Sequence, residues 1–176
     1  ITVGGGIRSV DDAWNLFKSG ADKIALNTAA IANPELITQI SQRFGNQAVV
    51  ISIEAQAKPD GSWEAYVDNG REKTGIDVVA WAKQVEQLGA GEILLTSVDQ
   101  EGTQKGFDLK LIESVSQEVS IPVIASGGMG SLEDFKSCVV DARADAVAVA
   151  HMLHYKKLSV SEIKEFAMSN DIPVRP

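Results

Sequence analysis

The chain has 176 residues, of which 44% are hydrophobic and 23% charged, a composition typical of one globular domain with its own core. Its formal net charge of -8 argues against a general nucleic-acid-binding protein, because such proteins neutralise phosphates with clustered Lys and Arg. No apolar run reaches membrane-spanning length, no signal peptide is recognisable, and the single cysteine, Cys138, excludes an internal disulfide, so we expect a cytoplasmic protein.

Short apolar runs rich in Val, Ile and Leu recur along the chain and predict buried strands of a parallel sheet. The predicted strands cover residues 1–3, 23–26, 48–53, 92–97, 122–125 and 145–150. Helical patterns alternate with them at residues 9–19, 34–44, 77–88, 108–119, 131–140 and 159–169. This strict alternation predicts a parallel sheet covered by helices.

Turn residues punctuate the predicted elements. Gly20 and Gly89 each follow a predicted helix and are typical C-terminal stops. The sequence KPDG at residues 58–61 lies between the strand-like runs 51–57 and 63–67, and it predicts a hairpin that extends the third strand.

One passage of the chain occurs twice, at residues 5–12 and 127–134. In each copy a Gly-Gly pair follows a strand, and a Ser with an Asp three residues later predicts a helix N-cap with a capping box. A repeated strand–turn–helix unit indicates an internally duplicated α/β fold.

Six β/α units form either an open doubly wound sheet or most of a closed barrel. The two glycine turns are four units apart, which favours an eight-stranded barrel with the first and fifth predicted strands opposite each other. We therefore predict an incomplete TIM-type (β/α) barrel of six units, a single domain over residues 1–176 with two units missing.

In such a barrel the carboxyl ends of the strands and the loops after them build the binding site. The residues at these positions are Gly5, Gly6, Asn27, Thr28, Glu54, Thr96, Asp99, Glu101, Gly102, Ser126, Gly127, Gly128, Ala150 and His151. Because the two glycine turns face each other across the barrel mouth, they predict two anion pockets for a substrate with a phosphate at each end. The alternative is that both are tight turns without a ligand.

Between the two pockets lie Glu54 and Asp99, with Thr96 and Ser126 as hydrogen-bonding neighbours. A carboxylate in a site that excludes water is a candidate general acid or base. The alternative is a structural carboxylate satisfied by backbone groups or by Lys.

Other notable side chains have plainer interpretations. His151 and His154 lack a third ligand nearby, so we predict no metal site. Trp14 and Trp81 are predicted to pack helices against the core.

Seven segments of the chain resemble the cyclase subunit of imidazole glycerol phosphate synthase, an enzyme of histidine biosynthesis. They are TVGGGI (2–7), GADK (20–23), NTAA (27–30), GAGEILLTS (89–97), GT (102–103), GFD (106–108) and IASGG (124–128). The resemblance runs along the whole chain and covers the third to eighth units of that family's barrel.

The resemblance implies a reaction, a substrate and a partner. The family forms imidazole glycerol phosphate and an aminoimidazole carboxamide ribonucleotide from a bisphosphorylated ribulosyl intermediate, with ammonia from a glutaminase partner. No cofactor is implied.

Matching motifs also imply roles for individual residues. One phosphate would be bound by Gly6, Asn27 and Thr28. The other would be bound by Glu101, Gly102, Gly128, Ala150 and His151. Lys23 and Glu92 match charged residues at the ammonia entrance, and Thr96 and Ser126 would line the substrate between its phosphates.

The chain departs from the family pattern at the catalytic carboxylates. The family's acid/base pair is an Asp on the first strand, which has no counterpart here, and an Asp at the position of Glu54. The extra methylene matters because a displacement of about 1 Å can cost roughly 10²-fold in rate. The family usually has Asp at Glu101 and Ser at His151. We therefore expect this chain alone to lack cyclase activity.

Two other functions remain open at this stage. One is a related barrel that amidates nucleotide-linked sugars, and the other is a non-catalytic barrel fragment that self-associates. Because a six-unit barrel leaves two strand edges unpaired, we expect a homo-oligomer in which a second copy closes the gap.

Overall fold

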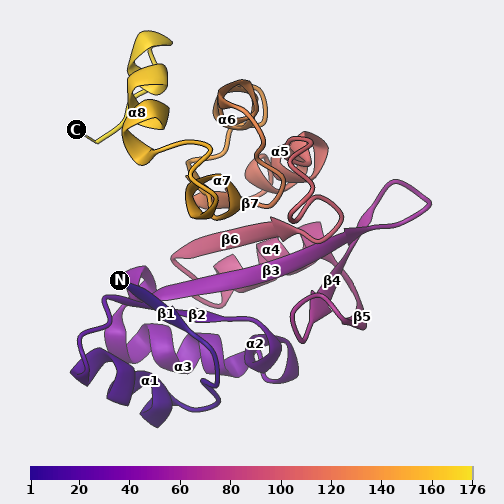
Figure 1. The fold of residues 1–176 in the computed structure, drawn as a ribbon. Coiled ribbons are helices and arrows are strands. Elements are labelled where there is room, and N and C mark those ends of the chain that lie inside the picture. Colours follow the sequence, from indigo (N-terminus) through magenta and orange to yellow (C-terminus); the bar gives the residue numbers. More distant parts are fainter. Residues whose placement is uncertain (176) are drawn as a thin grey trace.

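The computed structural model describes residues 1–175, and a curved wall of six parallel strands forms its centre (Figure 1). The strands follow one another in the sheet in the order β1-β2-β3-β6-β7-β8. Their bounds are β1 Thr2–Gly4, β2 Lys23–Leu26, β3 Val49–Ala57, β6 Glu92–Ser97, β7 Val123–Ser126 and β8 Ala146–Ala148. Parallel strands in chain order, each connected through a helix, form an incomplete β/α barrel, as predicted.

Helices follow each strand and run around the outside of the wall, with α1 and α3 below it in Figure 1, α4 behind, and α5 and α6 above. Their bounds are α1 Val10–Lys18, α2 Thr28–Ala32, α3 Glu35–Phe44, α4 Val78–Gln87, α5 Leu109–Ser116, α6 Leu132–Val140, α7 His151–His154 and α8 Val160–Ser169. A 3₁₀ turn, η1 Asn46–Ala48, leads into β3. The predicted C-terminal stops are confirmed, since Gly20 and Gly89 both have φ of 103° directly after a helix.

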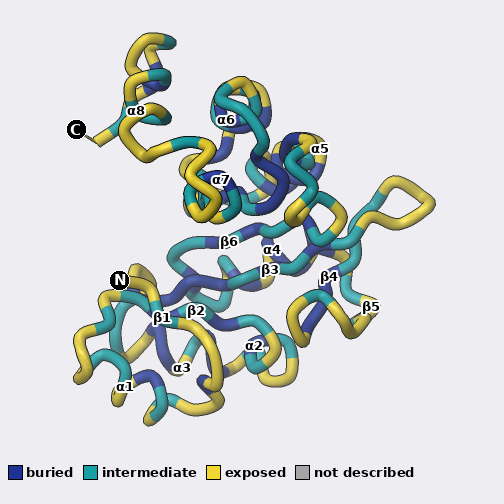
Figure 2. The backbone as a smooth tube through the Cα atoms, in the orientation of Figure 1, coloured by how far each residue is buried: buried dark blue, intermediate teal, exposed yellow. Residues whose placement is uncertain are grey.

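The core lies between the strands and the helices. Along β3, Ile51 and Ile53 are 0% and 1% exposed because they face the helices, whereas Ser52 and Glu54 face the barrel interior and are half-buried. Figure 2 shows this as a dark band along β3 and β6, with exposed residues on α8 and on the hairpin tip. The interior face therefore stays accessible to small molecules.

The predicted hairpin is confirmed, and it has one strand more than predicted. β4 Trp63–Val67 pairs antiparallel with the second half of β3, and β5 Glu72–Asp77 then pairs antiparallel with β4. β5 escaped the sequence pattern because its burial alternates between exposed and half-buried residues, with no apolar run.

Within residues 1–175, β1 pairs with β2 and β8 with β7, so each end of the wall keeps one unpaired edge. β1 and β7 are separated by β2, β3 and β6, which places the two predicted glycine turns four strands apart. That spacing corresponds to opposite sides of an eight-stranded barrel.

Two expectations about local structure need correction. The strand predicted over residues 145–150 is shorter, since β8 covers only Ala146–Ala148, and the short helix α7, which was not predicted, starts at His151. Trp14 is 43% exposed, because it lies on the outer face of α1 and stacks on Phe44 instead of entering the core. Trp81 is 2% exposed and packs in the core as predicted.

Candidate functional site

Polar side chains line up on the interior face at the carboxyl ends of three neighbouring strands. Glu54 pairs with Thr96 in the β3–β6 register, and Thr96 pairs with Ser126 in the β6–β7 register. Paired residues of a parallel sheet share one face, so the three side chains point into the barrel together. The candidate acid/base residue and its two predicted neighbours are thus adjacent.

A cavity of about 730 Å³ lies at the first glycine turn and is called here the Gly5–Gly6 cavity. The residues that line it are Gly4, Gly5, Gly6, Ile7, Arg8, Ala25, Leu26, Asn27, Thr28, Ala29, Ala32, Asn33, Ser52, Glu54, Asp68 and Asn69. A cavity of this size and mixed polarity is typical of a small-molecule site. Five sequence-predicted site residues therefore border one space: Gly5 and Gly6 after β1, Asn27 and Thr28 after β2, and Glu54 on β3.

The turn itself leaves its backbone open to this cavity. Gly5 and Gly6 have φ of 103° and 70°, and a Cβ on either would have no heavy atom within 4 Å. Ser9 then caps α1 by accepting from the Asp12 N–H at 3.1 Å, and Asp12 accepts from the Arg8 N–H at 3.0 Å. Backbone N–H groups at the start of a helix favour an anion, and the turn presents its glycines there without side chains in the way.

A second, smaller cavity of about 30 Å³ lies at the other glycine turn and is called the Gly127–Gly128 cavity. The residues that line it are Glu101, Gly102, Gln104, Ser126, Gly127, Gly128, Met129, Ala148, Val149, Ala150 and His151. The six residues predicted for this pocket, from Glu101 to His151, therefore converge on one place together with Ser126, and they come from the ends of β6, β7 and β8.

Close packing explains the glycines of this second turn. A Cβ on Gly128 would lie 2.1 Å from the Gly106 carbonyl oxygen, and the Gly106 N–H donates to the Gly128 carbonyl at 2.9 Å. A Cβ on Gly127 would lie 2.9 Å from the Ser97 carbonyl oxygen. The loop after β6 is therefore fastened to the turn after β7, and it brings Glu101 to the cavity.

His151 reaches the same cavity from the first residue of α7. Its ring packs on Tyr155, with centroids 4.5 Å apart, and Tyr155 also contacts His154 edge-on at 4.9 Å. An imidazole N–H can donate a hydrogen bond to an anion. The cyclase family that the sequence resembles usually has a serine hydroxyl at this position.

Asn27 and Thr28 connect the first cavity to the hairpin. The Asn27 side-chain amide donates to the Tyr66 carbonyl at 3.2 Å, and the Thr28 hydroxyl accepts from the Asp68 N–H at 3.4 Å. The other amide atom, Asn27 Oδ1, is buried and makes no hydrogen bond within the described residues. A buried polar atom without a partner at a cavity wall is a place where a ligand donor fits.

Glu54 is held from the same hairpin. Its Oε2 accepts from the Gly70 N–H at 2.6 Å. Burial raises the pKa of the Glu54 carboxyl, and the Asp68 carboxylate raises it further, against the lowering effects of hydrogen bonds from Gly70 and Asn27. A carboxyl that holds its proton more tightly than usual suits a general acid/base.

Asp99 has a structural partner instead. Its carboxylate accepts from the Ala57 N–H at 2.8 Å, and the neighbouring Val98 N–H donates to the Ala55 carbonyl at 2.8 Å. Asp99 is exposed and borders neither cavity. Its observed contact corresponds to the plainer of the two interpretations, a carboxylate satisfied by backbone.

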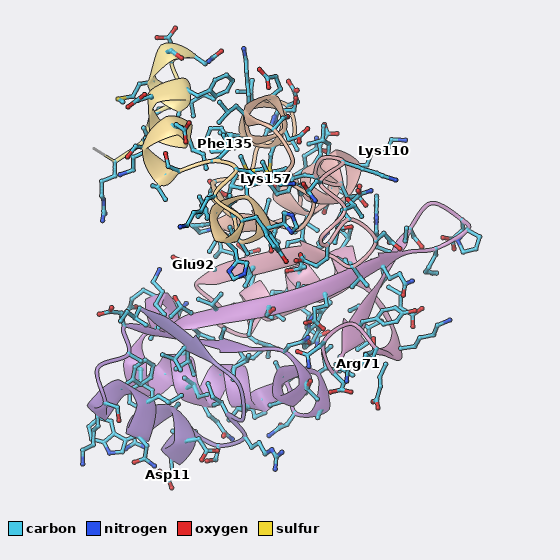
Figure 3. The ribbon with its side chains drawn as sticks, in the orientation of Figure 1. Asp11, Arg71, Glu92, Lys110, Phe135 and Lys157 are labelled. Carbon is cyan, nitrogen blue, oxygen red and sulfur yellow. The ribbon has the colours of Figure 1, made fainter. Side chains whose placement is uncertain are left out.

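At the amino ends of the strands, Lys23 on β2 and Glu92 on β6 form an ion pair past the intervening strand β3. Their side chains are 33% and 21% exposed, so the pair is partly shielded from water. Figure 3 labels Glu92 at the start of β6 and Arg71 beside the β4–β5 turn, at opposite ends of the strands. The pair thus lies at the amino ends of the strands, away from both cavities.

Sequence reasoning missed several polar residues of the first cavity, among them Arg8, Asp68 and Asn69. Arg8 directly follows the glycine turn and could have been noted as a cation beside an anion pocket. Asp68 and Asn69 belong to a D-N-G sequence typical of tight turns, but only the β4–β5 pairing brings that turn back over Glu54.

Over residues 1–175 no group of three or more His, Cys, Asp and Glu side chains is placed to hold a metal ion. In the same part of the chain, no helix has the length and hydropathy needed to span a membrane.

Comparison with known proteins adds independent information. The model of the family described as "Histidine biosynthesis protein" matches residues 1–159. Imidazole glycerol phosphate synthase subunit HisF of Prochlorococcus marinus strain MIT 9215 is 56% identical over 177 aligned residues, which cover 99% of this chain and 69% of that protein. The corresponding subunit of Alkaliphilus metalliredigens strain QYMF is 49% identical over 175 residues, with the same shares of the two chains.

Proposed function

This chain belongs to the histidine biosynthesis protein family together with the HisF subunits of imidazole glycerol phosphate synthase, and we propose that it provides the cyclase site of such a synthase. The observation that supports this most strongly is the pair of glycine turns, which border two cavities at the carboxyl ends of β1 and β7. In this proposal each cavity takes one phosphate of a bisphosphorylated ribulosyl substrate.

In the first cavity, the backbone of Gly5 and Gly6 meets one phosphate, with Asn27 and Thr28 as side-chain partners. In the second, Gly102, Gly127, Gly128 and Ala150 supply backbone, and His151 supplies the imidazole. The carboxylate of Glu101 repels a phosphate, so its role there is to accept a hydrogen bond from a substrate hydroxyl.

Glu54 is the proposed proton-transfer group. Its side chain borders the Gly5–Gly6 cavity, and in the strand register it lies beside Thr96, which is followed by Ser126 at the Gly127–Gly128 cavity. Ring closure with ammonia moves protons between nitrogen and oxygen atoms, and a carboxyl whose pKa is raised by burial can both accept and return one. Thr96 and Ser126 hold the substrate chain by hydroxyl hydrogen bonds.

We propose that ammonia enters at the Lys23–Glu92 ion pair, at the end of the barrel opposite the cavities. The glutaminase subunit that supplies it would dock at this end. The route then runs along the interior face, from the amino ends of the strands to Glu54 at their carboxyl ends.

Isothermal titration tests the two-phosphate site. The bisphosphorylated ribulosyl intermediate should bind this chain at least tenfold more tightly than the same compound with one phosphate removed, because only the former reaches both cavities. Equal affinities would contradict the proposal. We also expect no ammonia-dependent turnover by the purified chain, since the second catalytic carboxylate of the resembling family has no counterpart here.

The open wall favours a second, non-catalytic property. β1 and β8 each present an unpaired parallel edge, which can pair with another strand. We propose that two copies of this chain associate at these edges. Sedimentation should then give a concentration-dependent dimer, whereas a monomer at all concentrations up to about 100 µM would refute self-association.

A further inference from the structure

The β4–β5 turn, residues 68–70, has an unusual backbone. Asp68, Asn69 and Gly70 have φ of 52°, 56° and 73°, three consecutive residues in the left-handed region. Asp and Asn adopt that region more readily than other residues with a Cβ, but at some cost in free energy. Such a turn is maintained only where surrounding contacts hold it.

The turn is closed by the Arg71 N–H, which donates to the Val67 carbonyl at 3.1 Å, and its further hydrogen bonds lead to the Gly5–Gly6 cavity. The Gly70 N–H donates to Glu54 Oε2 at 2.6 Å, and the Asp68 N–H donates to the Thr28 hydroxyl at 3.4 Å. Just before the turn, the Tyr66 carbonyl accepts from the Asn27 amide at 3.2 Å. Three bonds from one hairpin thus reach three predicted site residues.

We propose that the turn at residues 68–70 is a positioning element that fixes how Glu54 presents its carboxyl to the cavity. The Gly70 N–H holds one carboxylate oxygen, Glu54 Oε2, in place. Asp68, which borders the same cavity, places a negative charge beside that carboxyl. This deepens the proposed function, because it rests on Glu54 being the proton-transfer group.

The two parts of the turn act on the Glu54 proton in opposite directions. A hydrogen bond from an N–H stabilises the ionised carboxylate and lowers its pKa, whereas a neighbouring carboxylate destabilises it and raises the pKa. The charged residues that line the cavity with Glu54 are Asp68 and Arg8, and the paired strand β6 presents Thr96. Substitutions at the turn therefore predict shifts of opposite sign.

The experiment is a pH titration of the Glu54 side-chain carboxyl by ¹³C NMR on the full chain, with the resonance assigned by its loss in Glu54→Gln. Asp68→Asn should move the midpoint to lower pH. Gly70→Ala should move it to higher pH, because a Cβ there is strained at φ 73° and lies 3.1 Å from Val98 Cγ2, which displaces the N–H.

Matched controls separate this role from a general effect on the hairpin. Asp60→Asn removes a carboxylate from the β3–β4 turn, and Gly75→Ala places a Cβ at φ 74° where nothing lies within 4 Å, on a residue whose N–H also donates to a glutamate, Glu64, at 2.8 Å. Both should leave the Glu54 midpoint unchanged.

An unchanged midpoint in Asp68→Asn, or shifts as large in the controls, would refute the positioning role. If Gly70→Ala fails to fold, Asp68→Asn still decides the matter. The titration needs no substrate, so it is independent of the bisphosphate test: loss of two-phosphate binding would contradict the proposed function alone.

Discussion

Ser9 and Ser131 have nearly the same backbone conformation, with φ of -147° in both and ψ of 164° and 168°. Each hydroxyl accepts from the N–H of the aspartate three residues on, at 3.1 Å in both cases. The repeat seen in the amino-acid sequence is therefore a repeat of local structure that includes the serine caps of α1 and α6. Of these two helices only α6 has the full capping box, in which the Ser131 N–H donates back to Asp134 at 2.9 Å.

The two glycine turns nevertheless differ in how tightly they are packed. Gly128→Ala should destabilise the chain by about 3 kcal/mol, because a Cβ would lie 2.1 Å from the Gly106 carbonyl oxygen and φ is 106°. Gly20→Ala is the control, with φ 103° and no heavy atom within 4 Å of the added Cβ; it should cost about 1 kcal/mol. Urea unfolding measures both, and equal losses would show that the loop after β6 yields to the added methyl group.

Sulfate should bind at both turns. The Gly5–Gly6 turn offers open backbone, and the Gly127–Gly128 cavity offers backbone and His151. A crystal structure from sulfate-containing solution is expected to show density at each turn. A high-resolution map with neither site occupied would rule out the anion pockets, and occupancy at the first turn alone would limit the prediction to that cavity.

The Lys23–Glu92 ion pair should contribute more to the free energy of unfolding than an ion pair on the surface. Its side chains are 33% and 21% exposed, whereas those of Lys83 and Glu118 are 50% and 46% exposed. In a double-mutant cycle with Lys23→Met and Glu92→Gln, we expect a coupling of about 1 kcal/mol. The same cycle at Lys83 and Glu118 should give less than about 0.5 kcal/mol. Similar couplings would argue that water reaches the interior pair freely.

Glu54 should make stability depend on pH in a defined direction. Burial raises the pKa of its carboxyl in the folded chain, so the folded state binds the proton more tightly than the unfolded state. Stability is therefore lost as pH rises from the unfolded pKa, 4.5, through the higher folded value.

Glu54→Gln removes this loss and keeps an acceptor for the Gly70 N–H. At pH 7 the variant should be more stable than the parent chain, by less than about 1 kcal/mol because water still screens the half-exposed carboxyl, or up to about 4 °C in Tm. At pH 3.5 the difference should vanish. Glu72→Gln, at an exposed position of β5, is the matched control. A gain in Tm that is the same at both pH values would contradict the assignment.

The order of strands and helices was predictable because each wall strand is an apolar run between recognisable caps and stops. Ile51, Ile53, Ile93 and Leu95 face the helices and are at most 1% exposed, which is why the β/α alternation was readable. The sequence did not predict β5 or α7, because both are short, carry no apolar run and are held in place by neighbouring segments.

The site was predictable where it follows from strand ends and not where it depends on the hairpin. The register of the parallel sheet places the carboxyl ends of neighbouring strands side by side. It therefore aligns Glu54, Thr96 and Ser126. Asp68 reaches Glu54 only because β4 pairs antiparallel with β3 and β5 folds back on β4. Asp99 accepts a hydrogen bond from the Ala57 N–H because β3 extends beyond the end of β6. Neither contact produces a repeating pattern of residues from which it could be predicted.

The division of β3 between two partners has a consequence for dynamics. Along one edge its first half pairs with β2 and its second half with β4, while residues 50–55 pair with β6 along the other edge, so the hairpin joins the wall along residues 54–57. β4 and β5 can therefore open as one small cooperative unit while β6 and β7 stay closed, which amide hydrogen exchange would register as earlier exchange in the hairpin. The groups that hold Glu54 would then belong to the less stable part of the molecule and the two glycine turns to the more stable part. The proposed proton-transfer geometry would form and break while the proposed phosphate sites stay intact.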